Sequence, residues 1–369
     1  MRLLVIGGSV FLGRAFAQEA LRRGWEVTTF NRGRTQADLD GVQVVRGDRE
    51  RPQDLARLAG AGPWDAIVDV CGYVPRVVGA SVEALAQSAS TYLFISSINA
   101  RPGWPAEPVD ESSPRHHSSI DAGAEDGDYG TLKAGCERAV EQGFPGRTLI
   151  LEPGLVIGPH DLARRATWWL RRAAQGGRML APGAPDREMQ LIDARDIATF
   201  GLDRIEAEDA GMYLVSGTPA NATWGGFLGA CVAETGGKAE LEWVDEEILT
   251  EHEIGVWTEL PLWAPLEGET AAIWKPSSAK AIAAGLRCRP VEESLHDTAT
   301  WLFGPGGLDE AFGEVRTGRE ATGITPEREQ ALLRAADARP AGAGRTAPRT
   351  GRTDPRADSG AQAAERRQP

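Results

Sequence analysis

Four side chains that could carry out proton transfer lie in two short segments of the chain. Ser96 and Ser97 follow an apolar run, and Tyr129 and Lys133 stand four positions apart. Residues four apart on a helix share one face, so the ammonium can lie beside the phenol and favour its ionised form. A serine hydroxyl bonded to a substrate carbonyl would complete a group that can protonate the carbonyl oxygen near neutral pH.

The spacing of Tyr129 and Lys133 occurs by chance in many helices, and its alternative interpretation is an exposed helical turn without chemistry. Lysine is scarce here, because the 40 basic residues include only four lysines. A lysine at this spacing therefore favours the functional interpretation.

A glycine-containing turn near the N-terminus predicts a dinucleotide-binding site. Residues 3–6 form an apolar run typical of a buried parallel strand, and Gly7, Gly8 and Gly13 follow before a helix that we expect to begin near Phe11. Glycines permit a close approach of the backbone to a pyrophosphate, and the helix N-terminus presents its amides to the negative charge. The spacing departs from the usual fingerprint, so a turn that binds nothing is the alternative.

The turn after the second expected strand, residues 25–30, should select the cofactor. Asn31, Arg32 and Arg34 occupy this turn, where enzymes that prefer NAD usually carry an acid that holds the ribose hydroxyl. An arginine accommodates a 2′-phosphate instead, which favours NADP(H), with NAD(H) as the alternative cofactor. Two solvated arginines are the other interpretation.

Further apolar runs at residues 42–45, 66–70 and 92–95 alternate with helical stretches. This order predicts an α/β fold with a Rossmann-like, doubly wound parallel sheet and ligands at the carboxyl ends of the strands. Asp48 would then lie near the adenine and Gly72 near the pyrophosphate or ribose, although each could also be a cap or a turn residue.

Composition excludes several classes of function. The chain has 369 residues and a formal net charge of −13, which argues against a nucleic-acid-binding surface. It contains no apolar stretch long enough to cross a bilayer, so we expect no membrane partner and a cytoplasmic location. Its four cysteines are widely spaced and its five histidines lack metal-site spacing, so we expect reduced thiols and no metal.

Taken together, these segments resemble the extended and atypical short-chain dehydrogenases/reductases, the NAD-dependent epimerase/dehydratase family, over about residues 1–303. The resembling segments are 7–13, 94–97, 129–133, 153–159, 192–197 and 285–301. The resemblance implies that Ser97 polarises the substrate oxygen, that Tyr129 is the general acid/base, and that Lys133 holds the nicotinamide ribose and tunes the tyrosine. It also implies a homodimer. The cofactor contacts that we expect are Gly7, Gly8, Ser9, Phe11, Leu12, Gly13, Asn31, Arg32, Arg34, Asp48, Cys71, Gly72, Ser96, Lys133, Pro153 and Leu155.

Two departures from the family pattern concern the substrate. Nucleotide-sugar epimerases of this group carry arginine, asparagine and tyrosine where this chain has Glu152, Leu155 and Ile157, and Ala100 and Arg101 replace the usual Val-Tyr after the serines. An apolar wall in place of a polar one favours a less polar carbonyl compound over a sugar nucleotide.

The remaining segments predict a substrate lobe and a tail. We expect a Rossmann domain over residues 1–160 with a returning segment at about 189–218, a discontinuous C-terminal α/β substrate lobe over 161–188 and 219–303, a helical extension over 304–338 and a disordered tail over 339–369. The loop over 99–128 is either a lid, which we favour, or a simple insertion. Substrate contacts are expected from Tyr73, Asn99, Trp168, Trp257 and Trp263, although core packing explains the tryptophans almost as well.

The sequence thus predicts an NADPH-dependent, ketoreductase-like enzyme that reduces a carbonyl of a small, fairly apolar metabolite. One alternative is an NAD-dependent nucleotide-sugar epimerase or dehydratase. A second is a non-catalytic member of the fold that senses dinucleotides or binds a partner.

Overall fold

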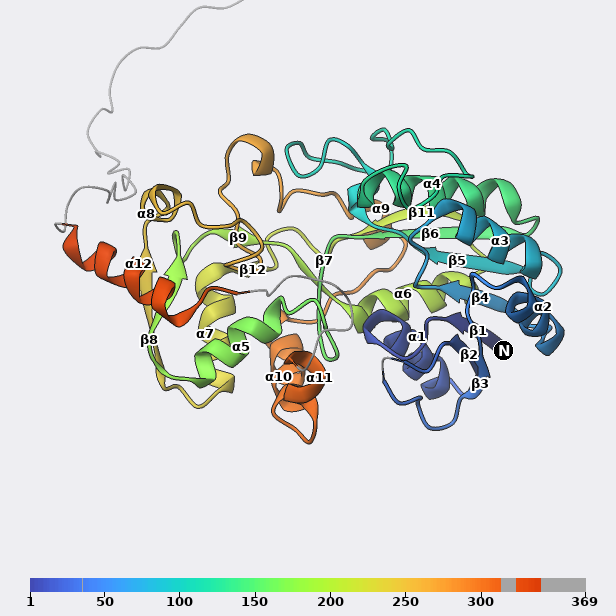
Figure 1. Cartoon of the computed structure of the whole chain (residues 1–369), viewed down its shortest axis with the longest axis horizontal. Coiled ribbons are helices and arrows are strands. Elements are labelled where there is room, and N and C mark those ends of the chain that lie inside the picture. The colour runs from blue at the N-terminus through green and yellow to red at the C-terminus, as the bar shows by residue number, and fades with distance from the viewer. Residues whose placement is uncertain (35, 313–322, 340–369) are drawn as a thin grey trace, which may run out of the picture.

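The chain folds into two lobes that lie side by side (Figure 1). The computed structural model describes residues 1–34, 36–312 and 323–339. The first lobe is built on a seven-stranded sheet in which all neighbouring strands are parallel. In spatial order its strands are β11 (Gly211–Val215), β6 (Arg147–Pro153), β5 (Thr91–Ile95), β4 (Ala66–Asp69), β1 (Arg2–Ile6), β2 (Glu26–Asn31) and β3 (Gln43–Arg46).

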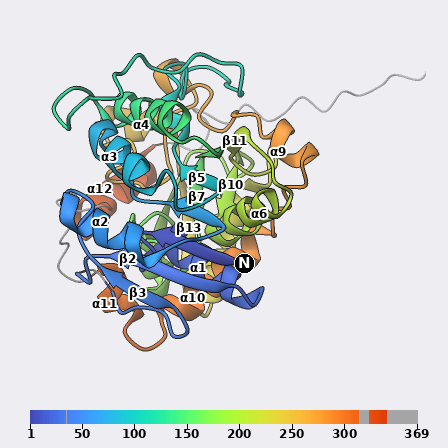
Figure 2. The same cartoon turned by 90° about the vertical axis from the view of Figure 1, so that its right-hand side faces the viewer.

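Helices cover both faces of this sheet, as Figure 2 shows. Alternate residues of β1 point to opposite faces: Leu3 and Val5 belong to one apolar core, and Leu4 and Ile6 belong to the other. Burial on both faces explains why the strand sequences are continuous apolar runs. The first core is covered by α1 (Phe11–Arg22) and α6 (Ala194–Glu206), and the second by α2 (Pro52–Ala61), α3 (Pro75–Leu85) and α4 (Tyr129–Gly143).

The strand order reverses beside β1. The chain runs from β1 to β2 and β3 on one side and then crosses to β4, β5 and β6 on the other. In such sheets a crevice opens at the carboxyl ends of the strands where the order reverses, and ligands bind there. The predicted α/β class with a doubly wound parallel sheet is therefore confirmed, and the fold itself fixes where a dinucleotide can lie.

The second lobe has its own apolar core around Trp169, Trp224 and Phe227. Within it β8 pairs in parallel with β13, and β9 pairs antiparallel with β12. Its elements are α5 (Ala166–Ala174), β8 (Gly177–Pro182), β9 (Glu188–Met189), β12 (Ala222–Thr223), α7 (Trp224–Glu234), β13 (Ala239–Val244), α8 (Glu246–Glu251), η2 (Gly268–Thr270), α10 (Val291–Leu302), α11 (Gly307–Phe312) and α12 (Pro326–Ala338). The short helix α9 (Ala279–Ala283) packs against the first lobe through Ala281.

The segment that was expected to return to the main sheet divides in two. β11 joins the edge of the sheet beside β6, but β10 (Leu191–Asp193) pairs with β7 (Leu155–Ile157) in a separate two-stranded ladder. This ladder continues directly from β6. It therefore lies where the chain passes from the first lobe to the second.

Two expectations concern the C-terminal part. Arg339, the first residue of the expected disordered tail, follows the end of α12 and forms ion pairs with Glu247 and Glu251 of α8. The prediction for residues 340–369 lies outside the described residues. In the part of the chain that the structure describes, no helix has the length and apolar character needed to span a membrane.

Candidate active site

The turn between β1 and α1 forms a narrow backbone cradle. Gly7 adopts a φ of +93°, and its amide donates to the Phe30 carbonyl at 2.9 Å, which fixes the turn against β2. A Cβ at Gly13 would collide with the carbonyl oxygen of Gly7, so only glycine fits at that position. The first turn of α1 then faces the crevice, as the pyrophosphate of a dinucleotide requires. This geometry fits the cofactor that the sequence predicted.

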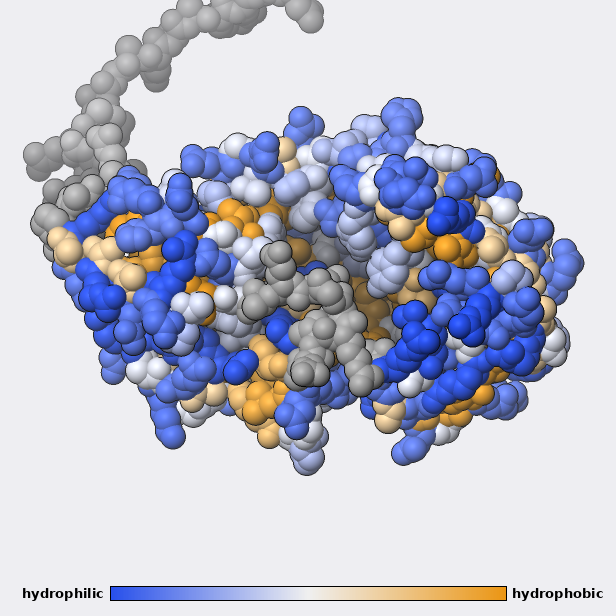
Figure 3. Space-filling view, viewed as in Figure 1, coloured by the Kyte–Doolittle hydropathy of each residue, from blue (hydrophilic) through white to orange (hydrophobic). Residues whose placement is uncertain are grey.

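A cavity of about 990 Å³ opens at this turn. It runs along the carboxyl ends of the strands, and Figure 3 shows an apolar recess on this side of the molecule, between the two lobes. The predicted cofactor and catalytic residues that line it are Gly7, Ser9, Phe11, Leu12, Gly13, Asn31, Arg32, Asp48, Cys71, Ser96, Ser97, Tyr129, Pro153 and Leu155. One cavity therefore brings together segments that span most of the first lobe.

Four of the predicted cofactor and catalytic residues do not line the cavity. Gly8 is buried against Thr29, Gly72 is buried against Phe94, and Arg34 is exposed on the second turn. Lys133, the fourth, lies beneath the cavity wall. For Gly8 and Gly72 the structure gives a packing role, since a side chain there would strike the neighbouring strand.

Lys133 is 2% exposed, and its ammonium is held by backbone carbonyls. Nζ donates to the Ile95 carbonyl at 2.6 Å and to the Gly72 carbonyl at 2.9 Å, and it lies 4.4 Å from the centre of the Phe94 ring. An ammonium has three donors, so one remains for another acceptor. Lys133 thus joins the ends of β4 and β5 below the catalytic groups.

Tyr129 and Ser97 face the cavity from adjacent elements. Tyr129 is the first residue of α4 and is 47% exposed, and the Asp128 side chain caps the helix by accepting from the Thr131 amide at 2.8 Å. Ser97 follows β5, and its Oγ accepts from the Asn99 amide at 3.2 Å. Because Oγ acts as an acceptor there, its hydroxyl hydrogen is available to a substrate oxygen.

A buried charged network lies behind Ser96. The Ser96 hydroxyl bonds to Glu137, which also accepts from Arg115 at 3.1 Å. Nearby, Arg101 bonds to Glu152 and to the Ser113 carbonyl. These contacts tie the long loop before α4 to the sheet. They favour a fixed wall over a moving lid for the part of this loop near Arg101.

The second turn carries a cation that the sequence analysis missed. Arg46 ends β3 and bonds to both Asn31 and Asp38, and its guanidinium packs against Gly33. Arg32 lies 3.9 Å from Asp48. The alternation of strands placed β3 next to β2, so the position of Arg46 could have been found from that register.

Beneath the turn after β4, Arg49 and Asp69 form a buried pair. The Arg49 Nη1 and Nη2 atoms donate to the two Asp69 oxygens at 2.9 and 2.8 Å, and the Tyr92 hydroxyl donates to Asp69 at 2.8 Å. Arg49 also contacts the Cys71 sulfur at 3.6 Å. Burial raises the pKa of the Cys71 thiol, so this cavity residue stays protonated at neutral pH. All four cysteines are free thiols.

Of the expected substrate residues, Tyr73 and Asn99 line the cavity and the tryptophans do not. Trp263 is 2% exposed in the core of the second lobe, which corrects its assignment as a substrate wall. Trp168 packs edge-on against Trp169 with ring centres 4.6 Å apart, and Trp257 packs on the same core. The large apolar side chains of this lobe form its core. Sequence alone does not distinguish such a core from a binding surface.

Several cavity residues were not predicted. Among them are Ile98, Trp104, Leu162 and Arg165 at the catalytic end. Trp104 belongs to the long loop, and its indole nitrogen donates to the Ile273 carbonyl at 3.3 Å, which fixes the ring between the lobes. No motif marks these residues, because their role depends on how the two lobes meet.

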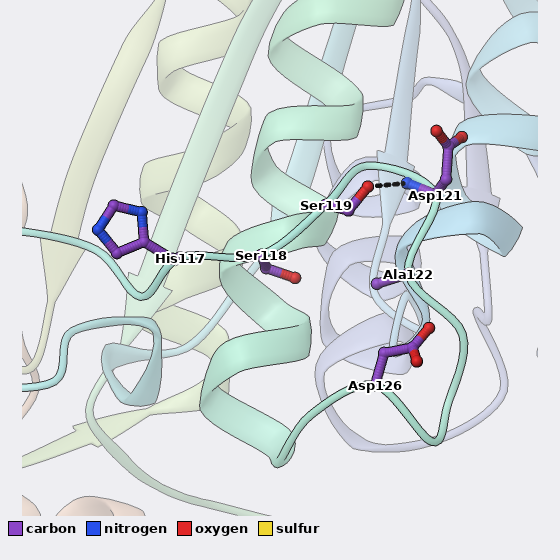
Figure 4. Close-up of a pocket in the computed structure, with 6 residues that line it drawn as sticks. All are labelled: His117, Ser118, Ser119, Asp121, Ala122 and Asp126. Carbon is purple, nitrogen blue, oxygen red and sulfur yellow. Dashed lines mark hydrogen bonds between the residues drawn. The ribbon is translucent and has the colours of Figure 1, made fainter.

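A second pocket, of about 600 Å³, lies in the loop before α4 (Figure 4). It is lined by His117, Ser118, Ser119, Asp121, Ala122 and Asp126. Within it the Asp121 amide donates to the Ser119 hydroxyl at 3.1 Å and the Ala122 amide donates to the Ser119 carbonyl at 3.3 Å, while the His117 and Asp126 side chains lie well apart. Across residues 1–34, 36–312 and 323–339, no His, Cys, Asp and Glu side chains gather in a group that could hold a metal. The candidate active site is therefore the larger cavity.

The chain belongs to the NAD dependent epimerase/dehydratase family, whose model matches residues 3–213. The description of this family names NAD as the dinucleotide of its members. The resemblance predicted from the sequence is confirmed.

Two curated relatives share part of this chain. It is 28% identical over 222 residues to the 2-alkyl-3-oxoalkanoate reductase of Stenotrophomonas maltophilia (strain K279a), covering 54% of this chain and 64% of that protein. It is 23% identical over 263 residues to the chloroplast stem-loop binding protein of 41 kDa b of Arabidopsis thaliana, covering 65% of each. The chain therefore spans less than two thirds of either relative.

Solved structures share the fold across nearly their whole length. The Bordetella bronchiseptica enzyme WbmH in complex with NAD+ superposes with a TM-score of 0.63 at 14% identity, covering 83% of this chain and 99% of that chain. The Thermus thermophilus UDP-glucose 4-epimerase in complex with NAD gives 0.57 at 19% identity, covering 81% and 98%. At these identities the likeness establishes the fold.

Proposed function

We propose that this protein is an NADPH-dependent, ketoreductase-like enzyme that reduces a carbonyl of a small, fairly apolar metabolite. The observation that carries the proposal is that Tyr129 and Ser97 line the same cavity as the glycine turn, while the second turn is basic. The name of the Stenotrophomonas relative supports a carbonyl substrate.

The bound dinucleotide would supply a hydride to the carbonyl carbon. Tyr129 would donate a proton to the carbonyl oxygen, and the free hydroxyl hydrogen of Ser97 would stabilise the negative charge that develops there. The third donor of Lys133 is available to the ribose beside Tyr129. Gly7, Ser9 and Gly13 would hold the pyrophosphate on the amides of α1.

The preference for NADPH rests on the basic second turn. Arg32 lines the cavity, and Arg46 supports the turn from β3. A hydrogen bond to a charged group contributes about 1.5–3 kcal/mol, so one good contact to the 2′-phosphate would favour NADPH by about 10- to 100-fold.

The proposal of an apolar substrate rests on the two departures from the family sequence pattern. Leu155 lines the cavity where sugar-nucleotide epimerases present asparagine, and Glu152 is buried in its pair with Arg101. Neither can offer a sugar nucleotide the polar contacts expected of the epimerase alternative. The net charge of −13 argues against the stem-loop binding that names the Arabidopsis relative.

The test is a side-by-side titration of the cofactor-stripped protein with NADPH and NADH, in which the fluorescence of the bound dinucleotide reports binding. We expect a clear preference for NADPH that is lost in the Arg32→Ala/Arg34→Ala variant and kept in Arg22→Ala, a control on the far end of α1. Tightly retained NAD in the isolated protein would instead support the epimerase or dehydratase. Binding of neither dinucleotide would contradict a redox function.

A further inference from the structure

One guanidinium in the cavity has no acidic partner within residues 1–34, 36–312 and 323–339. Arg165 immediately precedes α5, lines the cavity and is half-buried. Its Nη1 donates to the Val156 carbonyl at 3.3 Å, and no ion pair among the described residues includes it. Of its five N–H donors, most have no acceptor in the part of the chain that the structure describes.

The other cavity arginines are compensated. Arg49 donates to both oxygens of Asp69, and Arg32 lies 3.9 Å from Asp48. Arg14 and Arg138 are also half-buried without an ion pair, but neither lines the cavity, so Arg165 is the cavity guanidinium whose charge no carboxylate of the described residues offsets. Removing a charge from water without compensation costs free energy, so this position indicates that a ligand supplies the negative charge.

The turn that carries Arg165 is held in place from beneath. Asp161 is fully buried, and its carboxylate accepts from the Ala163 amide at 2.8 Å and the Arg165 amide at 3.4 Å. The guanidinium is fixed at its other end by Val156. Arg165 is thus preorganised, which lowers the entropy that a ligand must offset.

Arg165 lies at the catalytic end of the cavity. Its anchor, Val156, follows Leu155 on β7, which continues from β6, the neighbour of the strand that carries Ser97. The basic second turn follows β2, on the other side of β1. Arg165 is therefore separated by the width of several strands from the position expected for a 2′-phosphate.

We propose, resting on the reductase function above, that Arg165 binds an acidic group of the substrate, and that the substrate is a small oxo acid. The planar guanidinium matches a carboxylate with two parallel hydrogen bonds. Ile98, Trp104 and Leu162 line the same end and would cover the carbon skeleton. The carbonyl would then face Tyr129 while the carboxylate is held by Arg165.

The pyrophosphate of the cofactor is a second source of the same anionic chemistry. It already has the amide donors of the glycine turn and of α1. The two sources predict different kinetic changes, because loss of a pyrophosphate contact weakens NADPH binding for every substrate. Loss of a carboxylate contact changes only the discrimination between acids and neutral carbonyl compounds.

The experiment compares 3-oxooctanoate with its methyl ester and with 2-octanone, using NADPH oxidation by the whole protein. We expect the wild type to prefer the acid and Arg165→Met to lower the acid-over-ester ratio of kcat/KM by about 10- to 100-fold, through KM. Arg165→Lys should recover part of this ratio. Arg171→Met, on the same helix but outside the cavity lining, is the matched control and should keep it.

A binding measurement gives a second readout that does not need turnover. With NADP+ present, octanoate should raise the thermal midpoint of the wild type and of Arg171→Met, but not of Arg165→Met. Equal kcat/KM for acid and ester in the wild type would overturn the proposal while leaving the reductase intact. A rise in KM for NADPH alone in Arg165→Met would assign the anion to the pyrophosphate and overturn it too. No reduction of any of the three compounds, with no midpoint shift by octanoate, would contradict both proposals.

Discussion

Arg101 and Glu152 form a fully buried ion pair with two hydrogen bonds, Nε to Oε2 at 2.6 Å and Nη2 to Oε1 at 3.1 Å. These are two of the positions at which the sequence departs from the family pattern. The departures therefore compensate each other: an acid at the end of β6 is matched by a base after β5. The pair lies beside Glu137 and Arg115, so the network behind Ser96 holds two carboxyl groups and two guanidinium groups.

The pH dependence of stability should report this network. Burial, and then the neighbouring Glu137 carboxylate, raise the pKa of Glu152 to about 8 against the opposing effect of Arg101. Between its unfolded value of 4.5 and about 8, the folded state keeps a proton that the unfolded state has released. Stability should therefore fall as pH rises through this window and level off above it.

Urea denaturation at pH 5, 6, 7, 8 and 9 measures this slope. Glu152→Gln, which cannot titrate, should flatten it. Glu141→Gln, which also removes a partner of Arg115 but lies at the surface, is the control and should keep it. A Glu152→Gln curve parallel to the wild type would contradict the assignment.

Replacing Arg101 should lower the free energy of unfolding most at high pH. Arg101→Met leaves Glu152 without its donors and raises its pKa further, because Arg101 lowers that pKa. At high pH the fold must then either hold a proton that the unfolded state has released or bury an uncompensated charge. We expect a loss of about 3–5 kcal/mol at pH 9 and a smaller loss at pH 6, because removal of one partner of a buried pair is strongly destabilising. Arg178→Met breaks exposed pairs with Asp337 and Glu242 and should change stability far less, because solvent screens such pairs. Equal losses in the two variants would refute the argument.

The sequence predicted the elements whose signals are local. The run at residues 66–70 corresponds to β4 (Ala66–Asp69), and the helix expected near Phe11 begins there, since apolar runs and glycine turns depend on neighbours in the chain. Tyr129, which its four-residue spacing from Lys133 singled out, lines the cavity, and so does Ser97, which the family resemblance implied.

The rest of the site depends on long-range packing. Arg101 and Glu152 are 51 positions apart, and nothing local pairs them. Arg165 is one arginine in an arginine-rich stretch, and only the meeting of the two lobes places it in the cavity. Trp263 lies in a core, although the sequence predicted a binding wall. Both environments favour large apolar side chains, so the residue type does not distinguish them.

The glycine turn makes a separate prediction about cofactor binding. A Cβ at Gly13 would strike the Gly7 carbonyl, so Gly13→Ala must push α1 away from the turn. We expect NADPH affinity to fall at least tenfold, together with a loss of stability of about 1–3 kcal/mol from overpacking. Gly60→Ala is the matched control, because Gly60 lies in α2 with open space around it, and alanine should stabilise the helix by up to about 1 kcal/mol. Unchanged NADPH binding by Gly13→Ala in isothermal titration would contradict the cradle.

Substitutions of Tyr129 and Lys133 should affect turnover and stability differently. Tyr129 is 47% exposed at the start of α4, so Tyr129→Phe should fold normally and bind NADPH as the wild type does, while kcat falls by about 10²- to 10⁴-fold because the proton donor is gone. Lys133→Met differs, because it also removes the donor from the carbonyls of Ile95 and Gly72. Each buried carbonyl left unpaired costs about 1–3 kcal/mol, so this variant should lose stability as well as turnover. Full turnover by Tyr129→Phe on a confirmed carbonyl substrate would remove Tyr129 from the mechanism, whereas a Lys133→Met protein as stable as the wild type would show that its two carbonyl bonds do not support the fold.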